Sequence, residues 1–391
     1  MAERVGMEGS LAISEAVKLA NTDVVAAYPI TPQTHIVESL AEMVANGELD
    51  AEYVPVESEH SAMSACLGAS ATGARTFTAT AGQGLELMHE VLYAASSMSL
   101  PIVMAVANRA LSAPLSVWGD HSDVMAVRDT GWIQIFAENA QEAHDLVLWA
   151  FRAGEDPDVL LPVMVHVDGF NLSHVTEPIF LNDQSDVDKY LSVNKYPLPL
   201  HPDKPVTMGA FGPPFIYTEA KKAQAVAYEK SKNVLMKGLE EFETVFGRKY
   251  SPIETYRTGD AETLLLTMGS LSETASLAVD NMRDKGQKVG LVRIRLWRPF
   301  PFAEFRNAVK DVKTLVVLDR CLCIGGPGGP VASEVRSALY DQEKRPKVIS
   351  LIGGLGGRDV TPGDFEYMVS RGTEIAEKGS DAEYEMIGVR E

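Results

Sequence analysis

The sequence predicts an α/β protein of two domains, each with a mostly parallel sheet covered by helices. Its 391 residues are too many for one ordinary hydrophobic core. Short β-rich apolar runs alternate with helix-like segments, as parallel sheets require. This alternation breaks near residue 200 and restarts near residue 256. We therefore expect a first domain over 1–245 and a smaller second domain over 255–391.

Six strands are expected in the first domain, at 23–28, 51–56, 75–80, 101–106, 132–137 and 162–167. Helices are expected after Pro32 and over 58–71, 84–97 and 140–153. Apolar strands of this length, joined by helices, are typical of a sheet that is buried on both faces.

A proline-rich stretch at 196–214 predicts an extended connector or surface excursion, and a charged helix is expected over 218–245. Strands at 262–268, 288–294, 313–319 and 347–352, with helices between them, form the second domain.

Composition excludes several classes of function. Lys and Arg number 35 against 54 Asp and Glu, which gives a net charge of −19. Such a chain is a poor ligand for nucleic acid or an anionic membrane. Three cysteines cannot form a disulfide framework, and they fit a reducing compartment. No signal peptide and no apolar run of roughly 18 residues is present, so we expect a cytoplasmic protein.

Ligands of open α/β sheets bind beyond the carboxyl ends of the strands. The first loop at that edge lies in AAYPITPQTHIV, residues 26–37. Thr31 suits an N-cap, and Pro32 suits the first helical position. This pattern predicts a capped helix, and a hydroxyl at a helix N-terminus also suits a carboxylate ligand.

The next two loops carry a glutamate and a glycine pair. In PVESEHSAM, Ser58 suits an N-cap, and Glu59 in the first helical turn is favourable for the helix alone. The same carboxylate could hydrogen-bond a cofactor nitrogen. Gly82 and Gly84 allow a tight strand-to-helix turn, but the third glycine of a dinucleotide fingerprint is missing, so no nicotinamide site is expected.

The fourth loop begins with Arg109, which should have an anionic partner, either an internal acidic side chain or a ligand. The nearby Asp120-His121-x-Asp123 is read as a helix cap with solvated charges rather than a metal site. Cys321-x-Cys323 lacks further ligands and is not assigned a metal.

The second domain has two glycine-rich turns, GGPGGP at 325–330 and IGGLGGRDVTP at 352–362. They could be simple turns or cradles for phosphate, and neither carries the lysine and hydroxyl of a P-loop.

Five stretches occur together in order: YPITPQT, ESEHSA, TFTATAGQGLELMHE, NRALSAPLSVWGDHSD and GLGGRDVTP. With them, the chain resembles the alpha subunits of 2-oxoacid:ferredoxin oxidoreductases over its whole length, and RDTGW at 128–132 favours the pyruvate enzymes. The resemblance implies a pyrimidine-binding domain followed by a domain like the C-terminal domain of transketolases. It also implies reversible oxidation of pyruvate with coenzyme A to acetyl-CoA and CO2, using thiamine diphosphate, with electrons passed to ferredoxin.

The resemblance assigns roles by position. Glu59 matches the glutamate that hydrogen-bonds the pyrimidine ring of the cofactor. Thr31 and Arg109 match residues that bind the carboxylate and keto oxygen of the substrate. His121 is not shared by all relatives, and Gly82 stands where a serine is common. No metal ligand is expected in this chain.

The resemblance also implies partner subunits. The Gly-Asp-Gly motif that binds diphosphate and Mg²⁺ is absent from the sequence, as are cluster-binding cysteines. A beta subunit should carry the diphosphate-binding domain, and small gamma and delta subunits should carry [4Fe-4S] clusters and meet the acidic ferredoxin. Other 2-oxoacids, such as 2-oxoisovalerate or 2-oxoglutarate, remain alternative substrates, and a non-catalytic scaffold remains a second alternative.

Overall fold

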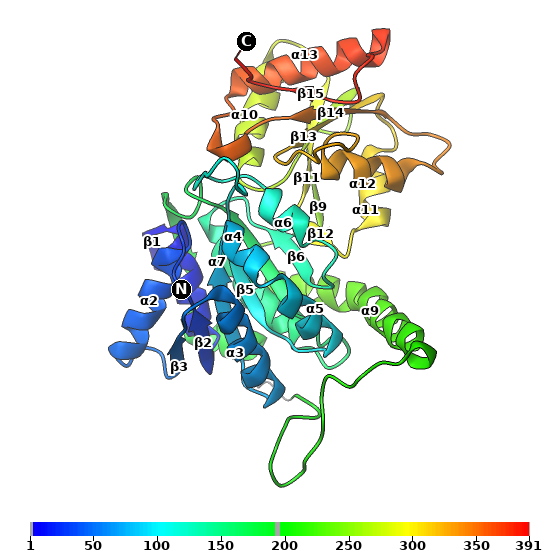
Figure 1. Cartoon of the computed structure of the whole chain (residues 1–391). Coiled ribbons are helices and arrows are strands. Elements are labelled where there is room, and N and C mark those ends of the chain that lie inside the picture. The colour runs from blue at the N-terminus through cyan, green and yellow to red at the C-terminus, as the bar shows by residue number, and fades with distance from the viewer. Residues whose placement is uncertain (1–2, 192–195, 391) are drawn as a thin grey trace.

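The computed structural model of the chain describes residues 3–191 and 196–390. Two large sheets form two layered bodies, the first in the lower half of Figure 1 and the second above it. Both sheets are mostly parallel and carry helices on both faces, so the predicted α/β fold class is confirmed.

The first sheet has the strand order β12-β6-β7-β5-β4-β2-β3, and only β12 is antiparallel to its neighbour. Its strands are β2 (Val24–Ala27), β3 (Glu52–Pro55), β4 (Thr76–Thr80), β5 (Val103–Asn108), β6 (Ile133–Phe136), β7 (Val163–Asp168) and β12 (Leu296–Arg298). Because β12 comes from the second half of the sequence, the chain returns to the first sheet after entering the second.

Alternate residues of these strands fill two different cores, as the two-residue period of a strand requires. In β5, Val103, Ala105 and Ala107 face one core while Met104 and Val106 face the other. The first core is covered by α1 (Gly9–Leu19), α2 (Thr34–Ala45), α7 (Ala140–Gly154) and part of α9 (Pro214–Phe246). The second is covered by α3 (Glu59–Ala71), α4 (Gly82–Leu87) and α5 (His89–Ser97).

The second sheet has the order β15-β14-β13-β10-β11-β9, with β9 antiparallel at one edge. Its strands are β9 (Ile253–Tyr256), β10 (Thr263–Thr267), β11 (Val289–Ile294), β13 (Thr314–Asp319), β14 (Lys347–Ile352) and β15 (Glu385–Met386). One face packs against α10 (Leu271–Asp284) and α13 (Pro362–Lys378), and the other against α11 (Phe302–Val309) and α12 (Pro330–Leu339). The short helix η1 (Leu355–Gly357) faces the first body.

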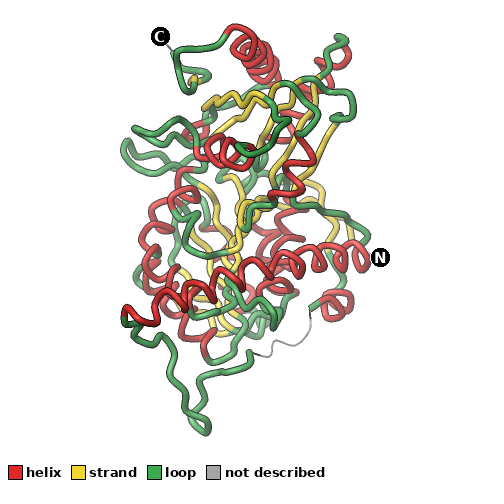
Figure 2. Tube along the Cα trace, turned by 90° about the vertical axis from the view of Figure 1, so that its right-hand side faces the viewer, coloured by secondary structure: helices red, strands yellow, loops and turns green. Residues whose placement is uncertain are grey.

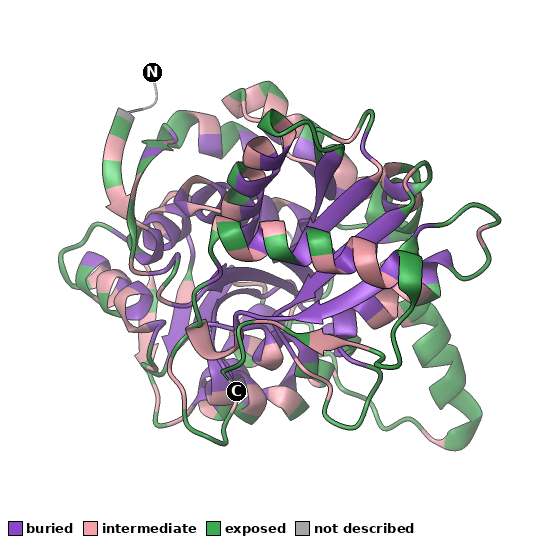
Figure 3. Ribbon diagram, turned by 90° about the horizontal axis from the view of Figure 1, so that it is seen from above, coloured by how far each residue is buried: buried purple, intermediate pink, exposed green. Residues whose placement is uncertain are grey.

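The remaining elements lie outside the two large sheets. Strand β1 (Glu3–Glu8) pairs antiparallel with β8 (Thr176–Leu181), and α6 (Ser122–Ala126) and α8 (Gln184–Tyr190) are short. Helix α9 runs across the molecule in Figure 2, and its first half is mostly exposed (Figure 3). The segment 196–213 lies below the first body in Figure 1 and is mostly exposed, without a helix.

Two predicted helix boundaries are wrong. The helix predicted over 84–97 is two helices, α4 and α5, which meet at Met88. The charged helix begins at Pro214 rather than at 218, because a proline is well tolerated in the first turn. In the described part of the chain, no helix is both long and apolar enough to cross a membrane.

Candidate active site

Four loops meet at the carboxyl edge of the first sheet. They follow β2, β3, β4 and β5, which are neighbours in the sheet and run parallel. This arrangement brings together the three residues singled out in the sequence: Thr31, Glu59 and Arg109. Their side chains therefore belong to one edge, where α/β proteins bind ligands.

The turn after β2 differs from its prediction. Thr31 does not cap a helix, because residues 30–33 form a turn closed by the Gln33 N–H donating to the Ile30 carbonyl at 2.8 Å. Helix α2 begins only at Thr34. The Gln33 side chain fixes this turn to the sheet by donating to the Ala79 carbonyl at 2.6 Å and accepting from the Ile30 N–H at 3.2 Å. Thr31 is left exposed at the rim of the edge.

Glu59 opens α3, as predicted. The Ser58 hydroxyl accepts a hydrogen bond from the Ser61 N–H at 3.2 Å, which confirms Ser58 as the N-cap. Glu59 is only 5% exposed as a residue. Within the described residues its carboxylate has no hydrogen bond and no ion pair, and its oxygens are not among the fully buried atoms without a partner, so they remain accessible at this edge of the sheet.

The glycine loop after β4 packs directly on these charged side chains. A Cβ on Gly84 would lie 2.5 Å from Glu59 Oε1 and 2.6 Å from Thr80 Oγ1. A Cβ on Gly82 would lie 3.0 Å from the Arg109 side chain, and Gly82 also has a φ of 49°. Both glycines are therefore needed for the loop to approach Glu59 and Arg109 closely.

Arg109 follows β5 directly and is 7% exposed. Its Nη1 donates to the Thr31 carbonyl at 3.0 Å, and its Nε donates to the Ser116 carbonyl at 2.9 Å. Among the described residues it forms no ion pair, so the first of the two expected partners, an internal acidic side chain, is not found. Burial lowers the pKa of Arg109, while the negative charges of Asp123 and Glu59 oppose that shift. The guanidinium thus joins the turn after β2 to the loop after β5 and interacts electrostatically with Glu59.

Asp123 ties the loops after β4 and β5 together. Its carboxylate accepts hydrogen bonds from the Gly82 N–H at 3.0 Å, the Arg109 N–H at 2.9 Å and the Asn108 amide at 3.0 Å. Burial raises the pKa of Asp123 to about 7, and these hydrogen bonds act against the rise. The Asp120-His121-x-Asp123 stretch is not a set of solvated charges, because all three side chains are buried.

His121 and Asp120 connect the site to the second body. His121 Nε2 lies 3.0 Å from Asp168 Oδ1, and Asp168 also pairs with Arg320 and accepts from the Ser270 hydroxyl at 2.6 Å. The Arg320 guanidinium and the imidazole hold the pKa of Asp168 well below its usual range, against the effect of burial. Asp168, at the end of β7, is therefore a buried contact between the two bodies.

The glycine-rich turn at 352–362 packs against the loop after β5. The Gly357 N–H donates to the Gly119 carbonyl at 2.8 Å, and the Gly356 N–H donates to Asp120 at 3.1 Å. A Cβ on Gly357 would lie 2.4 Å from Trp118 Cβ. These glycines therefore serve close packing between the two bodies.

The other glycine-rich turn, at 325–330, precedes α12. Asp319 accepts hydrogen bonds from the Val331 N–H at 2.8 Å and the Ala332 N–H at 3.0 Å. A carboxylate of the chain itself thus occupies the position that a phosphate would take at this helix N-terminus.

The chain matches two models of known protein families. The family model described as pyruvate flavodoxin/ferredoxin oxidoreductase, thiamine diphosphate-binding, matches residues 15–238. The model of pyruvate:ferredoxin oxidoreductase core domain II matches residues 261–365. The chain belongs to the pyruvate:ferredoxin oxidoreductase family.

Relatives in this family match nearly the whole chain. Pyruvate synthase subunit PorA of Methanothermobacter thermautotrophicus is 49% identical, covering 94% of both chains. PorA of Thermotoga maritima is 48% identical, covering 92% of both. Ketoisovalerate oxidoreductase subunit VorA of Pyrococcus abyssi is 45% identical, covering 95% of this chain and 94% of that one.

Two solved structures share the fold. A 2-oxoglutarate:ferredoxin oxidoreductase from Magnetococcus marinus, solved with 2-oxoglutarate, coenzyme A and succinyl-CoA, matches with a TM-score of 0.73 and 21% identity, covering 96% of this chain and 66% of that one. A split-gene transketolase, an inactive tetramer, matches with a TM-score of 0.56 and 12% identity, covering 95% and 100%.

Several residues that build this site were missed in the sequence. Gln33, Asn108 and Asp168 each follow or end a strand, as Thr31 and Arg109 do, so their position was the available signal. Their partners lie 46, 15 and 152 residues away in the sequence, beyond the reach of local patterns. In this pyruvate:ferredoxin oxidoreductase chain, short motifs show where the loops of the site lie. Hydrogen bonds between residues distant in the sequence fix the conformation of those loops.

Proposed function

We propose that this chain is the alpha subunit of a thiamine diphosphate-dependent pyruvate:ferredoxin oxidoreductase. The reaction converts pyruvate and coenzyme A to acetyl-CoA and CO2 and releases two electrons for ferredoxin, and it is reversible. The relatives named pyruvate synthase subunit support this assignment, since they match this chain over nearly its full length.

The observation that carries the proposal is the Glu59 carboxylate, which has no partner among the described residues although the residue as a whole is 5% exposed. A carboxylate on so enclosed a residue normally has hydrogen-bond donors, and the described protein supplies none to it. A ring nitrogen of an aminopyrimidine that carries a proton would satisfy it. Thiamine diphosphate, when bound, supplies the electron sink that lets the bond between the carboxylate and the keto carbon break. The role of Glu59 is to hold a proton at that ring nitrogen.

Arg109 and Thr31 are the proposed substrate residues. Arg109 is fixed by two backbone carbonyls, so its guanidinium is already oriented before substrate arrives. A partly buried guanidinium without an ionic partner suits a carboxylate or a keto oxygen. If Arg109 bound the carboxylate too tightly, it would stabilise the substrate more than the transition state. We therefore assign Arg109 and the exposed Thr31 mainly to orientation.

The chain needs partner subunits under this proposal. A beta subunit supplies the diphosphate site with its Mg²⁺, and gamma and delta subunits supply the [4Fe-4S] clusters. The sequence supports this division, because it has no Gly-Asp-Gly and only three cysteines. A net charge of −19 disfavours direct docking of an acidic ferredoxin on this chain.

The substitution Glu59→Gln in the assembled complex tests the proposal. We expect pyruvate-dependent ferredoxin reduction to fall at least about a hundredfold, the lower end for loss of acid–base catalysis. Glu57→Gln is the matched control, because Glu57 lies two residues away, is exposed, and its carboxylate accepts a hydrogen bond from the Ser61 hydroxyl. Near-normal turnover by Glu59→Gln would favour the scaffold alternative instead.

A second candidate is the same chemistry on a branched 2-oxoacid. The ketoisovalerate oxidoreductase subunit, at 45% identity, is nearly as similar as the pyruvate synthase subunits. Comparing kcat/KM of the complex for pyruvate, 2-oxoisovalerate and 2-oxoglutarate decides between them. A preference for 2-oxoisovalerate would replace pyruvate in the proposal and leave the role of Glu59 intact.

A further inference from the structure

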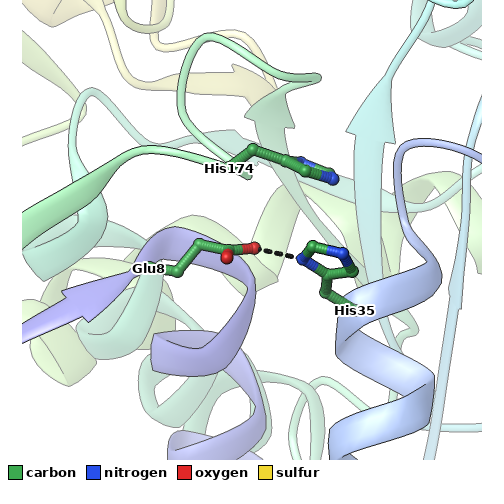
Figure 4. Close-up of side chains that lie close together, drawn as sticks. All are labelled: Glu8, His35 and His174. Carbon is green, nitrogen blue, oxygen red and sulfur yellow. Dashed lines mark hydrogen bonds and ion pairs between the residues drawn. The ribbon is translucent and has the colours of Figure 1, made fainter.

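Three potential metal ligands converge outside the active site from distant parts of the chain. Glu8 ends β1, His35 is the second residue of α2, and His174 lies in the loop between β7 and β8. Figure 4 shows the three side chains facing one another. One donor atom from each lies within 4.8 Å of the other two, and no other such trio occurs among the residues that the structure describes. His35 Nδ1 is 2.6 Å from Glu8 Oε1, and the two imidazole rings are 4.4 Å apart.

The His174 ring is already oriented by its neighbours. Its Nδ1 lies 2.8 Å from Ser173 Oγ, and its ring packs 4.7 Å from the ring of Phe170. Ser173 Oγ in turn accepts from the Phe170 N–H at 2.9 Å. This leaves Nε2 as the ring nitrogen available to a ligand, the arrangement in which an outer hydrogen bond orients a metal-binding histidine. Burial and the neighbouring His35 lower the pKa of His174, and the negative charge of Glu8 opposes that shift.

We propose that Glu8, His35 and His174 bind one divalent transition-metal ion, with Zn²⁺ as the best fit. Two imidazoles and one carboxylate are a common donor set for Zn²⁺, with water in the fourth position. Zn–N and Zn–O bonds of about 2.1 Å place tetrahedral ligand atoms roughly 3.4 Å from one another. The donor atoms of His35 and Glu8, now 2.6 Å apart, must therefore separate slightly, and any pair near the 4.8 Å limit must move closer. The His35 side chain is 44% exposed and has room to turn.

The position of the trio gives the ion a structural role. His35 stands in the first turn of α2, four residues after Thr31. The loop that carries His174 begins at Gly169, where an added Cβ would lie 2.6 Å from Pro32 Cγ. A bound ion would therefore clamp the first turn of α2 to the 169–174 loop, directly behind the turn that carries Thr31. This site is independent of the proposed function.

Metal titration of the full chain, purified without a histidine tag and stripped with chelator, tests the proposal. We expect one Zn²⁺ per chain by calorimetry, and Co²⁺ in its place should give the strong visible absorption of a tetrahedral site. Glu8→Gln, His35→Ala and His174→Ala should each abolish the binding. His89→Ala is the matched control, because His89 also pairs with a glutamate, Glu86, at 3.3 Å but belongs to no group of three ligands within the described part of the chain.

A variant that leaves all three ligands in place guards against loss of folding. Ser173→Ala should weaken Zn²⁺ binding about 10- to 100-fold by removing the hydrogen bond that orients His174. Hydrogen exchange should slow on adding Zn²⁺ in peptides covering 30–37 and 169–175 of the wild type, but not of His174→Ala. Absence of stoichiometric binding by the wild type, or full binding by His174→Ala, would overturn the proposal.

Discussion

The substitution Gly84→Ala should disable the site without replacing any proposed functional side chain. The new Cβ would stand 2.5 Å from Glu59 Oε1, whereas an ordinary contact begins at 3.4 Å. The carboxylate must therefore move by 3.4 − 2.5 = 0.9 Å, or the glycine loop must rise by that amount. A displacement of about 1 Å of a catalytic group costs on the order of a hundredfold in rate. We expect this loss in kcat, together with weaker thiamine diphosphate binding.

The assay is pyruvate-dependent ferredoxin reduction by the assembled complex, with cofactor affinity measured separately. Gly68→Ala is the matched control, because Gly68 lies in the same helix as Glu59 and its added Cβ would meet nothing within 4 Å. That control should keep full activity and gain up to about 1 kcal/mol of helix stability.

The reasoning depends on Gly84→Ala acting through Glu59. The double variant with Glu59→Gln should then be no slower than Glu59→Gln alone, because the two changes remove the same interaction. The reasoning would be refuted if the fold-losses in kcat of the two single variants multiplied in the double variant. It would also be refuted if the Gly84→Ala complex kept more than half of the wild-type kcat.

Three further predictions follow from the same contacts. Arg109→Ala should raise the KM for pyruvate and lower kcat/KM about 10- to 150-fold, the worth of a charged hydrogen bond, and unchanged kinetics would remove it from the site. Asp168→Asn should lower the free energy of unfolding of the full chain by about 3–5 kcal/mol, because Arg320 loses its buried partner; a loss below about 1 kcal/mol in urea titrations would contradict this. Burial raises the pKa of Asp319 from 3.8 to about 7, so the stability that the protonated group contributes is lost as pH rises through 7. Relative to Asp319→Asn, the wild type should lose at least about 1.4 kcal/mol of its free energy of unfolding between pH 4 and pH 8. Urea midpoints that change equally with pH in the two proteins would argue against the raised pKa.

The buried contacts of Asp168 explain how the two bodies stay aligned beside the site. Asp168 joins the end of β7 to Arg320, which follows β13, and to Ser270, which precedes α10. His121 contacts the same carboxylate and lies on the loop that begins with Arg109. Movement of the second body would therefore displace the loop that carries the proposed substrate residue Arg109.

Much of the fold was predictable because its signals are local. The alternating apolar runs marked ten of the thirteen strands described in the two large sheets, all except β9, β12 and β15. Ser58 with Glu59 marked the start of α3. Residues in one turn of helix or one strand contact one another whatever the rest of the chain does, so their pattern survives in the sequence. The glycines at 82 and 84 likewise signalled a tight turn.

Only the tertiary structure decided which charges are buried and what they contact. Thr31 lost its predicted capping role because Gln33 reaches Ala79, a residue on another strand. Asp123 changed from a presumed surface charge to a buried acceptor because β4 and β5 bring Gly82 and Arg109 to it. The Glu8, His35 and His174 trio has no sequence signal, since the desolvation and pairing of charges depend on long-range contacts.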